Sequence, residues 1–260
     1  MKKLTIVIST ANKRIVNLRL KPANSNVCYV IVHQVYDNAC LNEYRPNYIS
    51  RDDVKYIRLD YPGLSKSRNV GLEAVDTEYA YIMDDDVDFN LDKMERLVDF
   101  MSGNQVDVGT CQYEYEDGYM SGKYKGYAFR HNFLSAAKVA SIEICLKVKA
   151  IREKSIQFDE DFGLGTQLPS GEEYIFMVDA IKSGLNVWFY PLITGVHPNI
   201  TSGTDFYSTS NKILAKREML KRTFGVNAPF LIVAFWIKKM PVTLKKGYFL
   251  KFTKKMLLGK

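Results

Sequence analysis

The chain has 260 residues, of which 47% are hydrophobic, 13% aromatic and 25% charged, and its formal net charge is +7. This length suits one large α/β domain or two small ones. The balanced composition excludes an intrinsically disordered chain, a collagen-like repeat, a disulfide-stapled miniprotein and a polytopic membrane protein. The charge is uneven: residues 212–260 carry 13 basic side chains and one acid (+12), whereas residues 1–211 carry 23 basic and 28 acidic side chains (−5). A slightly acidic body argues against a nucleic-acid-binding protein.

Cysteine usage and the N-terminal residues bear on the cellular compartment. Cys28, Cys40, Cys111 and Cys145 lie far apart without a C-x-x-C pair, which argues against a zinc cluster and a redox dithiol. The apolar run near the N-terminus ends at Ser9 and is too short for a signal peptide. No stretch reaches the roughly 18 apolar residues that a transmembrane helix needs. We therefore expect a cytoplasmic location.

Short apolar runs alternate with a helical segment in the first part of the chain. Strands are predicted over residues 4–9, 27–32, 55–59 and 79–83, with a helix over residues 67–75 between the last two. Continuous apolar runs of this length are typical of parallel strands buried on both faces. The pattern predicts an α/β fold with an open, twisted, mostly parallel sheet and flanking helices. Ligands of such sheets bind beyond the carboxyl ends of the strands.

The middle of the chain predicts further elements of the same domain. Residues 107–130 read as strands joined by turns, and residues 136–148 fit either a strand or a helix. A helix is predicted over residues 172–183 and a strand over residues 187–190.

From residue 211 the chain is predicted to be helical, with helices to about residue 224, over residues 229–240 and over residues 244–258. We therefore expect a catalytic domain at residues 1–210 and a basic amphipathic helical region at residues 211–260. Its lysines alternate with aromatic and aliphatic side chains, a mixture that suits an anionic membrane surface. The alternative is that the apolar side packs on the domain and the lysines are solvated.

Three consecutive carboxylates, Asp84, Asp85 and Asp86, directly follow the strand at residues 79–83. At a strand end they enter a crevice, where their mutual repulsion calls for a compensating cation. Hard oxygen ligands select Mg²⁺ or Mn²⁺. The alternative is a solvated acidic loop.

A Gly/Ser-rich turn with two cations, Lys66 and Arg68, precedes these aspartates by one helix and one strand. Amide groups at a helix N-terminus and nearby cations form an anion site, although an ordinary helix cap has the same appearance. A phosphate site beside a divalent-metal site indicates a nucleotide diphosphate.

These residues carry a resemblance. GLSKSRNVGLEA at residues 63–74 and YIMDDDVDF at residues 81–89 resemble the nucleotide-sugar-binding region of family 2 glycosyltransferases, which have the GT-A fold. STANKR at residues 9–14 is similar to the family's opening turn, and FDEDFGLG with SGEEYIF, within residues 158–176, resembles its later acidic segment. The similarity spans roughly residues 1–200. It implies a GT-A-like fold and transfer of a sugar from a nucleotide diphosphate donor.

The resemblance also implies roles. Asp84 and Asp86 form the D-x-D signature, with Asp86 on the metal and Asp84 near the ribose or the metal. Glu173 stands where the family has its catalytic Asp and is expected to be the general base of an inverting displacement, with the adjacent Glu172 as the alternative base. His197 matches a further metal ligand supplied by some members, and Thr201-Ser202-Gly203 suits a flexible loop over the diphosphate. The nucleotide-sugar-binding side chains are expected to be Thr10, Asn12, Arg14, Gln34, Ser65, Arg68, Asn69, Asp84 and Asp85.

The chain departs from the family pattern at three places. Val32–Asn38 (VHQVYDN) replaces an Asp-rich turn that reads the nucleotide base, so Gln34 or Asp37 is the candidate for hydrogen bonding a uracil. Glu173 replaces Asp, and Asp179 stands where an Arg is usual. These departures favour a divergent member.

We therefore expect a metal-dependent, inverting glycosyltransferase that uses Mg²⁺ or Mn²⁺ and a nucleotide-sugar donor, most simply a UDP-sugar. The expected acceptor is a hydroxyl of a saccharide or lipid-linked saccharide in bacterial surface-polysaccharide synthesis, at the inner face of the plasma membrane. The alternatives are a nucleotidyltransferase and a non-catalytic, membrane-peripheral nucleotide-binding protein.

Overall fold

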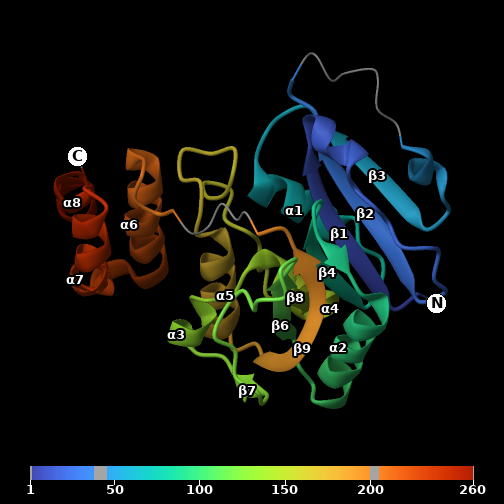
Figure 1. Cartoon of the computed structure of the whole chain (residues 1–260). Coiled ribbons are helices and arrows are strands. Elements are labelled where there is room, and N and C mark those ends of the chain that lie inside the picture. Colours follow the sequence, from blue (N-terminus) through green and yellow to red (C-terminus); the bar gives the residue numbers. More distant parts are fainter. Residues whose placement is uncertain (1, 38–45, 200–204, 260) are drawn as a thin grey trace.

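The computed structural model describes residues 2–37, 46–199 and 205–259 (Figure 1). Cys40 and the predicted loop Thr201-Ser202-Gly203 lie outside these residues. Within the described part of the chain, nine strands form one sheet in the order β3-β2-β1-β4-β8-β6-β9-β5, and β7 pairs with β9. The fold prediction is confirmed.

The first four strands make the parallel half of the sheet. They are β1 (Leu4–Ala11), β2 (Val27–Gln34), β3 (Val54–Leu59) and β4 (Tyr79–Asp84), and each runs parallel to its neighbours within this group. Register pairs Ser9 of β1 with Val32 of β2 and with Asp84 of β4. The carboxyl ends of β1, β2 and β4 therefore meet at one edge, where Asp84, Asp85 and Asp86 follow.

The second half of the sheet mixes directions. It contains β5 (Asp88–Phe89), β6 (Val108–Tyr115), β7 (Phe129–Arg130), β8 (Ile144–Lys147) and β9 (Val187–His197). Strand β8 is antiparallel to β4 and β6, whereas β6 and β9 are parallel. Strand β9 runs seven residues past the predicted end at Tyr190, because it continues pairing with β6 beyond a bulge, as far as Tyr115 opposite His197. This extension carries His197 to the sheet edge.

Helices cover both faces of the sheet. The α-helices are α1 (Leu64–Glu73), α2 (Leu91–Gly103), α3 (Phe133–Ala136), α4 (Val148–Glu153), α5 (Glu172–Lys182), α6 (Ser210–Phe224), α7 (Ala228–Lys245) and α8 (Phe249–Thr253). Short helical turns occupy η1 (Asn12–Val16), η3 (Asn47–Ser50), η4 (Ser141–Glu143), η6 (Gly225–Asn227) and η7 (Lys254–Leu258). The segment at residues 136–148, undecided from its pattern, thus contains a helix end, the turn η4, strand β8 and the start of α4.

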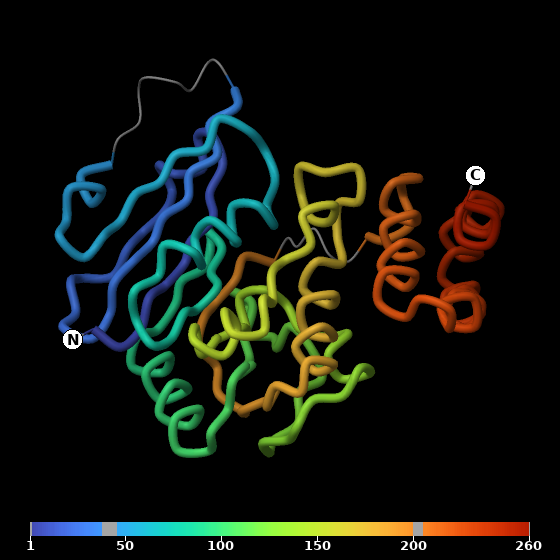
Figure 2. The backbone as a smooth tube through the Cα atoms, turned by 180° about the vertical axis from the view of Figure 1, so that it is seen from behind, coloured from blue at the N-terminus to red at the C-terminus, as the bar shows by residue number. Residues whose placement is uncertain are grey.

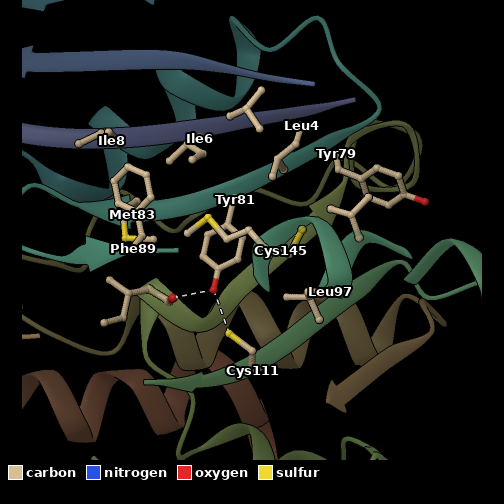
Figure 3. Packing of buried hydrophobic residues seen from close by; sticks show 14 of the residues in the cluster. Leu4, Ile6, Ile8, Tyr79, Tyr81, Met83, Phe89, Leu97, Cys111 and Cys145 are labelled. Carbon is tan, nitrogen blue, oxygen red and sulfur yellow. Dashed lines mark hydrogen bonds between the residues drawn. The ribbon is translucent and has the colours of Figure 1, made fainter. Parts of the chain in front are cut away.

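Two hydrophobic clusters lie on opposite faces of the sheet. On one face Leu4, Ile6 and Ile8 of β1 pack with α2 (Figure 3). On the other face Val7 packs with residues of α5, including Phe176. Alternate residues of one strand are buried on both sides, which is why these strands read as continuous apolar runs.

Helix α2 was not predicted, although its sequence carries the signal. Met94, Leu97, Val98 and Met101 are buried at helical spacing, and the side chain of Asn90 caps the helix by accepting a hydrogen bond from the amide of Lys93 at 3.0 Å.

Helix α1 lies unusually close to the sheet. A Cβ atom added at Gly71 would lie 2.4 Å from Cγ1 of Val7 and 3.2 Å from Cγ2 of Val32. Glycine therefore sets the separation between α1 and strands β1 and β2. The position of α1 in turn fixes Arg68, one turn earlier on the helix.

The C-terminal helices α6, α7 and α8 lie beside α5, on the opposite side of the molecule from β3 (Figures 1 and 2). A third hydrophobic cluster joins them to the domain: Phe162 and Ile175 pack with Ile213 and Met219 of α6 and with Phe252 of α8. Helix α7 continues past its predicted end at Met240, through Pro241, to Lys245. No helix in residues 2–37, 46–199 and 205–259 combines the length and apolar character needed to cross a bilayer.

Candidate active site

A cavity of about 900 Å³ opens at the carboxyl ends of β1, β2 and β4. Its lining includes Thr10, Arg14, Gln34, Arg68, Asp84, Asp85, Asp86, Glu172, Glu173 and His197, together with residues from α6 and the segment before it. The structure thus brings most of the predicted site residues to one cavity, from motifs more than 180 residues apart.

The three aspartates have different environments. Asp85 is buried, accepts a hydrogen bond from the hydroxyl of Thr10 at 2.6 Å and pairs with the guanidinium of Arg14. Asp86 is more exposed, lies 3.0 Å from Nη2 of Arg14 and faces His197. Hydrogen bonding to Asp85, and the charges of Asp85 and Asp86, raise the pKa of Arg14 above its usual range although burial opposes this. Arg14 therefore stays charged and anchors the two aspartates.

Arg68 joins Asp84 to the two glutamates. It is 1% exposed, and its guanidinium lies 3.2 Å from Asp84, 3.3 Å from Glu172 and 3.4 Å from Glu173. Burial disfavours its charge, but the three carboxylates outweigh burial and raise the pKa of Arg68. The ring of Phe158 lies against the guanidinium, 5.4 Å from its centroid to Cζ. Arg68 thus holds the strand end and the start of α5 at a fixed separation.

The two glutamates differ in accessibility. Glu172 is 4% exposed, and Oε2 has no hydrogen-bond partner among the described residues. Burial, and then the charge of Glu173, raise the pKa of Glu172 above its ordinary value. Glu173 retains 22% of its side-chain exposure and borders the cavity. Glu173 is therefore the more accessible of the two carboxylates from the cavity.

His197 ends β9 and lies against Asp86. Its Nδ1 is 2.7 Å from the carbonyl oxygen of Pro198, and its Nε2 is 3.7 Å from Oδ1 of Asp86. Because a carbonyl only accepts, the proton of a neutral ring lies on Nδ1, and Nε2 presents a lone pair toward a carboxylate. With the ring neutral, these two acceptors could share a cation: a carboxylate suits Mg²⁺ or Mn²⁺, and an imidazole is a borderline ligand for Mn²⁺.

The described residues do not enclose a metal ion by themselves. None of their His, Cys, Asp and Glu side chains form a group of three or more in a metal-binding arrangement. A cation at Asp86 and His197 would therefore take its remaining ligands from substrate and water, as is usual for Mg²⁺.

The first turn of α1 has protein partners in place of an anion. The amide of Gly63 donates to Oε1 of Gln34 at 2.7 Å, and the amide of Leu64 donates to the carbonyl of Leu164 at 2.9 Å. The ring of Tyr61 lies 5.6 Å from the ammonium of Lys66. Together with the carboxylate contacts of Arg68, these interactions give protein partners to the amides of Gly63 and Leu64 and to both cations of this turn.

Three predicted site residues contact backbone and are not among the residues lining the cavity. The hydroxyl of Ser65 donates to the carbonyl of Phe162 at 2.6 Å, and the amide side chain of Asn69 exchanges hydrogen bonds with the backbone of Phe158 at 2.9 Å. Oδ1 of Asn12, which has a positive φ of 48°, accepts the amides of Tyr36 and Asp37. These side chains shape the loops around the cavity.

The structure adds residues that the sequence interpretation missed. Asp205, Phe206, Lys212 and Lys216 line the cavity from α6 and the segment before it, and Tyr113, Tyr115 and Ser121 line it from β6 and the following turn. The region after residue 210, which was predicted either to contact a membrane or to pack on the domain, therefore forms a wall of this cavity. No motif marked these residues, because their position depends on how α6 packs against α5.

Comparisons with known proteins point to one family and one fold. The family model described as glycosyl transferase family 2 matches residues 37–159. Among curated proteins, none matches the chain.

Solved structures of S. aureus TarS share the fold. TarS 1-349 superposes with a TM-score of 0.66 at 13% identity, covering 99% of this chain and 92% of that one. Its complex with UDP-GlcNAc gives 0.64 at 17% identity, covering 85% and 66%. The longer TarS structure gives 0.60 at 19% identity and covers 86% of this chain, which spans only 44% of TarS. The resemblance to family 2 glycosyltransferases is confirmed over residues 37–159, and the fold is GT-A-like.

Proposed function

We propose that this protein transfers a sugar from a nucleotide diphosphate donor, with UDP-sugars as the first candidates, to a hydroxyl of a saccharide or lipid-linked saccharide. The observation that carries the proposal is the contact of one buried guanidinium, Arg68, with Asp84 on one side and Glu172 and Glu173 on the other. This contact joins Asp84, the carboxylate that we place beside the diphosphate, to Glu173, the candidate base, within one cavity. The family match and the UDP-GlcNAc complex of TarS support the donor class.

The proposed reaction is a single inverting displacement. Glu173 accepts the proton of the acceptor hydroxyl as that oxygen attacks the sugar carbon. Arg68 keeps the carboxylate of Glu173 oriented, and Thr10 and Arg14 hold Asp85 at the donor end. A Mn²⁺ or Mg²⁺ ion at Asp86 and His197 would stabilise the negative charge of the departing nucleoside diphosphate.

The test separates binding from turnover. UDP is titrated by calorimetry with and without Mn²⁺, and UDP-GlcNAc hydrolysis is then measured in wild type, Asp86→Ala and Glu173→Gln. We expect Mn²⁺-dependent binding that Asp86→Ala abolishes. In Glu173→Gln we expect binding to be retained and turnover to fall by about 10²- to 10⁴-fold, the usual contribution of a general base.

A matched control is Asp88→Ala, because Asp88 is an exposed carboxylate just past the same strand, paired with Lys21. It should bind and turn over as wild type does. Mn²⁺-independent UDP binding, or full turnover in both site variants, contradicts the proposal. Incorporation of a nucleotide into product in place of sugar transfer would favour the nucleotidyltransferase.

We further propose that the C-terminal helices contact an anionic membrane surface. Exposed apolar residues recur at helical spacing along η6 and α7: Val226, Phe230, Val233, Ile237 and Leu244. Phe230 is 77% exposed, and Leu250 on α8 is 83% exposed. Lysines flank this stripe, so its chemistry matches an interface of acyl chains and anionic headgroups.

Vesicle co-sedimentation tests this contact. The double variant Phe230→Ser/Ile237→Ser should lose most of the binding to vesicles containing phosphatidylglycerol. Leu134→Ser, at another exposed apolar residue (84% exposed) on α3, should bind as wild type does. Equal loss in both variants, or no loss in the double variant, argues against this surface.

A further inference from the structure

Glu143 carries a buried carboxyl group that the proposed reaction does not use. It lies in η4, is 2% exposed and forms no ion pair with any residue in the described part of the chain. Burial raises the pKa of Glu143 to about 8, and hydrogen bonds from Tyr124 and Ala140 oppose this rise. A buried carboxyl group without a cation destabilises a fold unless hydrogen bonds compensate it. The partners of Glu143 therefore show what this group holds in place.

The carboxyl group of Glu143 connects two segments that border the cavity. Its Oε2 accepts the amide of Ala140 at 2.9 Å, and its Oε1 accepts the hydroxyl of Tyr124. The hydroxyl of Tyr124 also hydrogen-bonds to the hydroxyl of Ser121. Ser121 and Ala140 are among the residues that line the cavity, whereas Tyr124 and Glu143 are not. A chain of three side chains thus runs from the buried acid to the cavity.

This chain gives the hydroxyl of Ser121 a fixed position. The ring of Tyr124 stacks on Phe189 of β9, with centroids 6.0 Å apart and planes 5° apart. Its hydroxyl can bond to both Glu143 and Ser121 in either protonation state of the acid, because a hydroxyl group donates and accepts. The amide of Ser121 also donates to the carbonyl of Tyr113 at 3.4 Å. A group held in this way loses little conformational entropy when it binds a ligand.

Ser121 and Gln34 border the cavity from opposite sides of β4. Strand β2 ends at Gln34, and Ser121 follows β6; in the sheet, β4 lies between these two strands. Asp86, where the diphosphate is proposed to bind, directly follows β4 and faces His197. The ring of His197 lies 5.8 Å from that of Tyr113, the residue whose carbonyl binds the amide of Ser121. Ser121 is therefore next to the diphosphate end of the cavity, away from Gln34.

The chemistry of the donor indicates which group meets Ser121. In a nucleotide-sugar, the diphosphate joins the nucleoside to the sugar, so the sugar extends from the end opposite the nucleoside. With the base at Gln34 and the diphosphate at Asp86, the sugar lies on the side of Ser121. We propose that Ser121 binds a hydroxyl of the donor sugar, and that Tyr124 and Glu143 are positioning residues that hold Ser121 for this contact. This inference rests on the proposed transferase function and adds a sugar contact to it.

Calorimetric titrations with UDP and UDP-GlcNAc, which differ by the sugar, test the proposal. The Kd of each ligand is measured in the presence of Mn²⁺ for wild type and for each variant. Ser121→Ala should raise the Kd of UDP-GlcNAc by about fivefold, the loss of one neutral hydrogen bond, and leave the Kd of UDP unchanged. Tyr124→Phe keeps the stacked ring and removes the link to Ser121, so it should raise the Kd of UDP-GlcNAc with the same selectivity.

Two control variants separate a positioning role from a purely structural one. Tyr119→Phe removes a hydroxyl from an exposed residue of the same turn that is not among those lining the cavity, and it should bind both ligands as wild type does. Glu143→Gln retains a group that can bond to both Tyr124 and Ala140, so it should retain the affinity for UDP-GlcNAc. A general loss of structure would weaken binding of both ligands alike.

The Ser121→Ala variant decides the sugar contact by itself. Equal changes in the two Kd values, or no change in either, overturn the contact, whether or not Tyr124→Phe folds. A selective loss in Ser121→Ala that is absent from Tyr124→Phe overturns the positioning roles of Tyr124 and Glu143. Wild type that binds UDP but not UDP-GlcNAc also overturns the contact. Failure of wild type to bind UDP contradicts the proposed function instead, because UDP carries no sugar.

Discussion

The two walls of the cavity are built on different physical principles. The wall at the ends of β1, β2 and β4 is a network in which Arg14 and Arg68 pair with every aspartate and both glutamates. The wall from α6 contains Lys216, which has no ion pair among the described residues. The first wall is held by ion pairs among its own residues, whereas Lys216 on the second wall forms no ion pair with another described residue. The difference separates side chains that charged partners fix in place from a side chain that no ion pair fixes.

Arg68→Met should break the first wall with the largest effect. The substitution leaves Asp84, Glu172 and Glu173 without their shared cation. We expect the free energy of unfolding to fall by about 3–5 kcal/mol, as when one partner of a buried ion pair is removed. Urea denaturation measures it. Arg58→Met, at an exposed arginine paired with Asp60, is the control and should change stability by less than about 1 kcal/mol. Equal effects in the two variants would contradict a structural role for Arg68.

Gly71→Ala should disturb the same wall indirectly, by displacing helix α1, which carries Arg68. The added methyl group would lie 2.4 Å from Cγ1 of Val7, so α1 must move away from the sheet and carry Arg68 with it. We expect a loss of about 1–3 kcal/mol, typical of an overpacked core. Calorimetric Tm values measure the loss. Gly103→Ala, where an added Cβ meets nothing within 4 Å, should be neutral or stabilising. A Tm unchanged in Gly71→Ala would show that α1 is not fixed by this contact.

Glu172→Gln tests the region where the two walls meet, through the pH dependence of the free energy of unfolding. Because burial raises the pKa of Glu172 above its unfolded value, the folded state binds the extra proton and wild-type stability falls as pH rises through this interval. Glutamine mimics the neutral acid. The free energy of unfolding of the variant, relative to wild type, should therefore increase with rising pH, by on the order of 1–2 kcal/mol between pH 4.5 and 8. Urea denaturation across this range measures the difference. Glu153→Gln, at an exposed residue, should show none; a parallel pH profile in Glu172→Gln would refute the raised pKa.

Phe206→Ala tests the second wall and should have the smallest effect. Phe206 lines the cavity and contacts Phe235, Phe252 and the ammonium of Lys239. Loss of these partly exposed aromatic contacts should cost about 1 kcal/mol and leave UDP affinity unchanged. Thermal unfolding and UDP titration measure the two quantities. A loss as large as that of Arg68→Met would mean that the two walls are equally structural.

The parallel half of the sheet could be predicted because its signals are local. A continuous apolar run such as residues 79–83 predicts a strand that is buried on both faces. A charged residue that directly follows such a strand must lie at the edge of the sheet. Helix α2 carried an equally local signal that the interpretation overlooked. The full length of β9 was not predictable, because it depends on pairing with β6 across a bulge.

The composition of the site was predictable, but the partners of its residues were not. The motifs identified the acidic residues at the end of β4 and the start of α5 that line the cavity, but not Asp205. They could not show that Arg68 faces carboxylates in place of phosphate, because that contact joins residues 68 and 172 across the fold. Lys216 lay beyond prediction for the same reason, since a helical pattern does not say which neighbour a helix packs on.

The bridge made by Arg68 has a consequence for how this fold tolerates change. Asp84 and Glu173 are separated by a long stretch of chain, yet both contact one side chain, so their spacing does not depend on the length of the segments between them. The exposed turn at residues 116–120 lies between Asp84 and Glu173 in the chain and next to Ser121, which borders the cavity. We expect insertions at this turn to change the rim of the cavity and to leave the contacts of Arg68 with Asp84 and Glu173 in place.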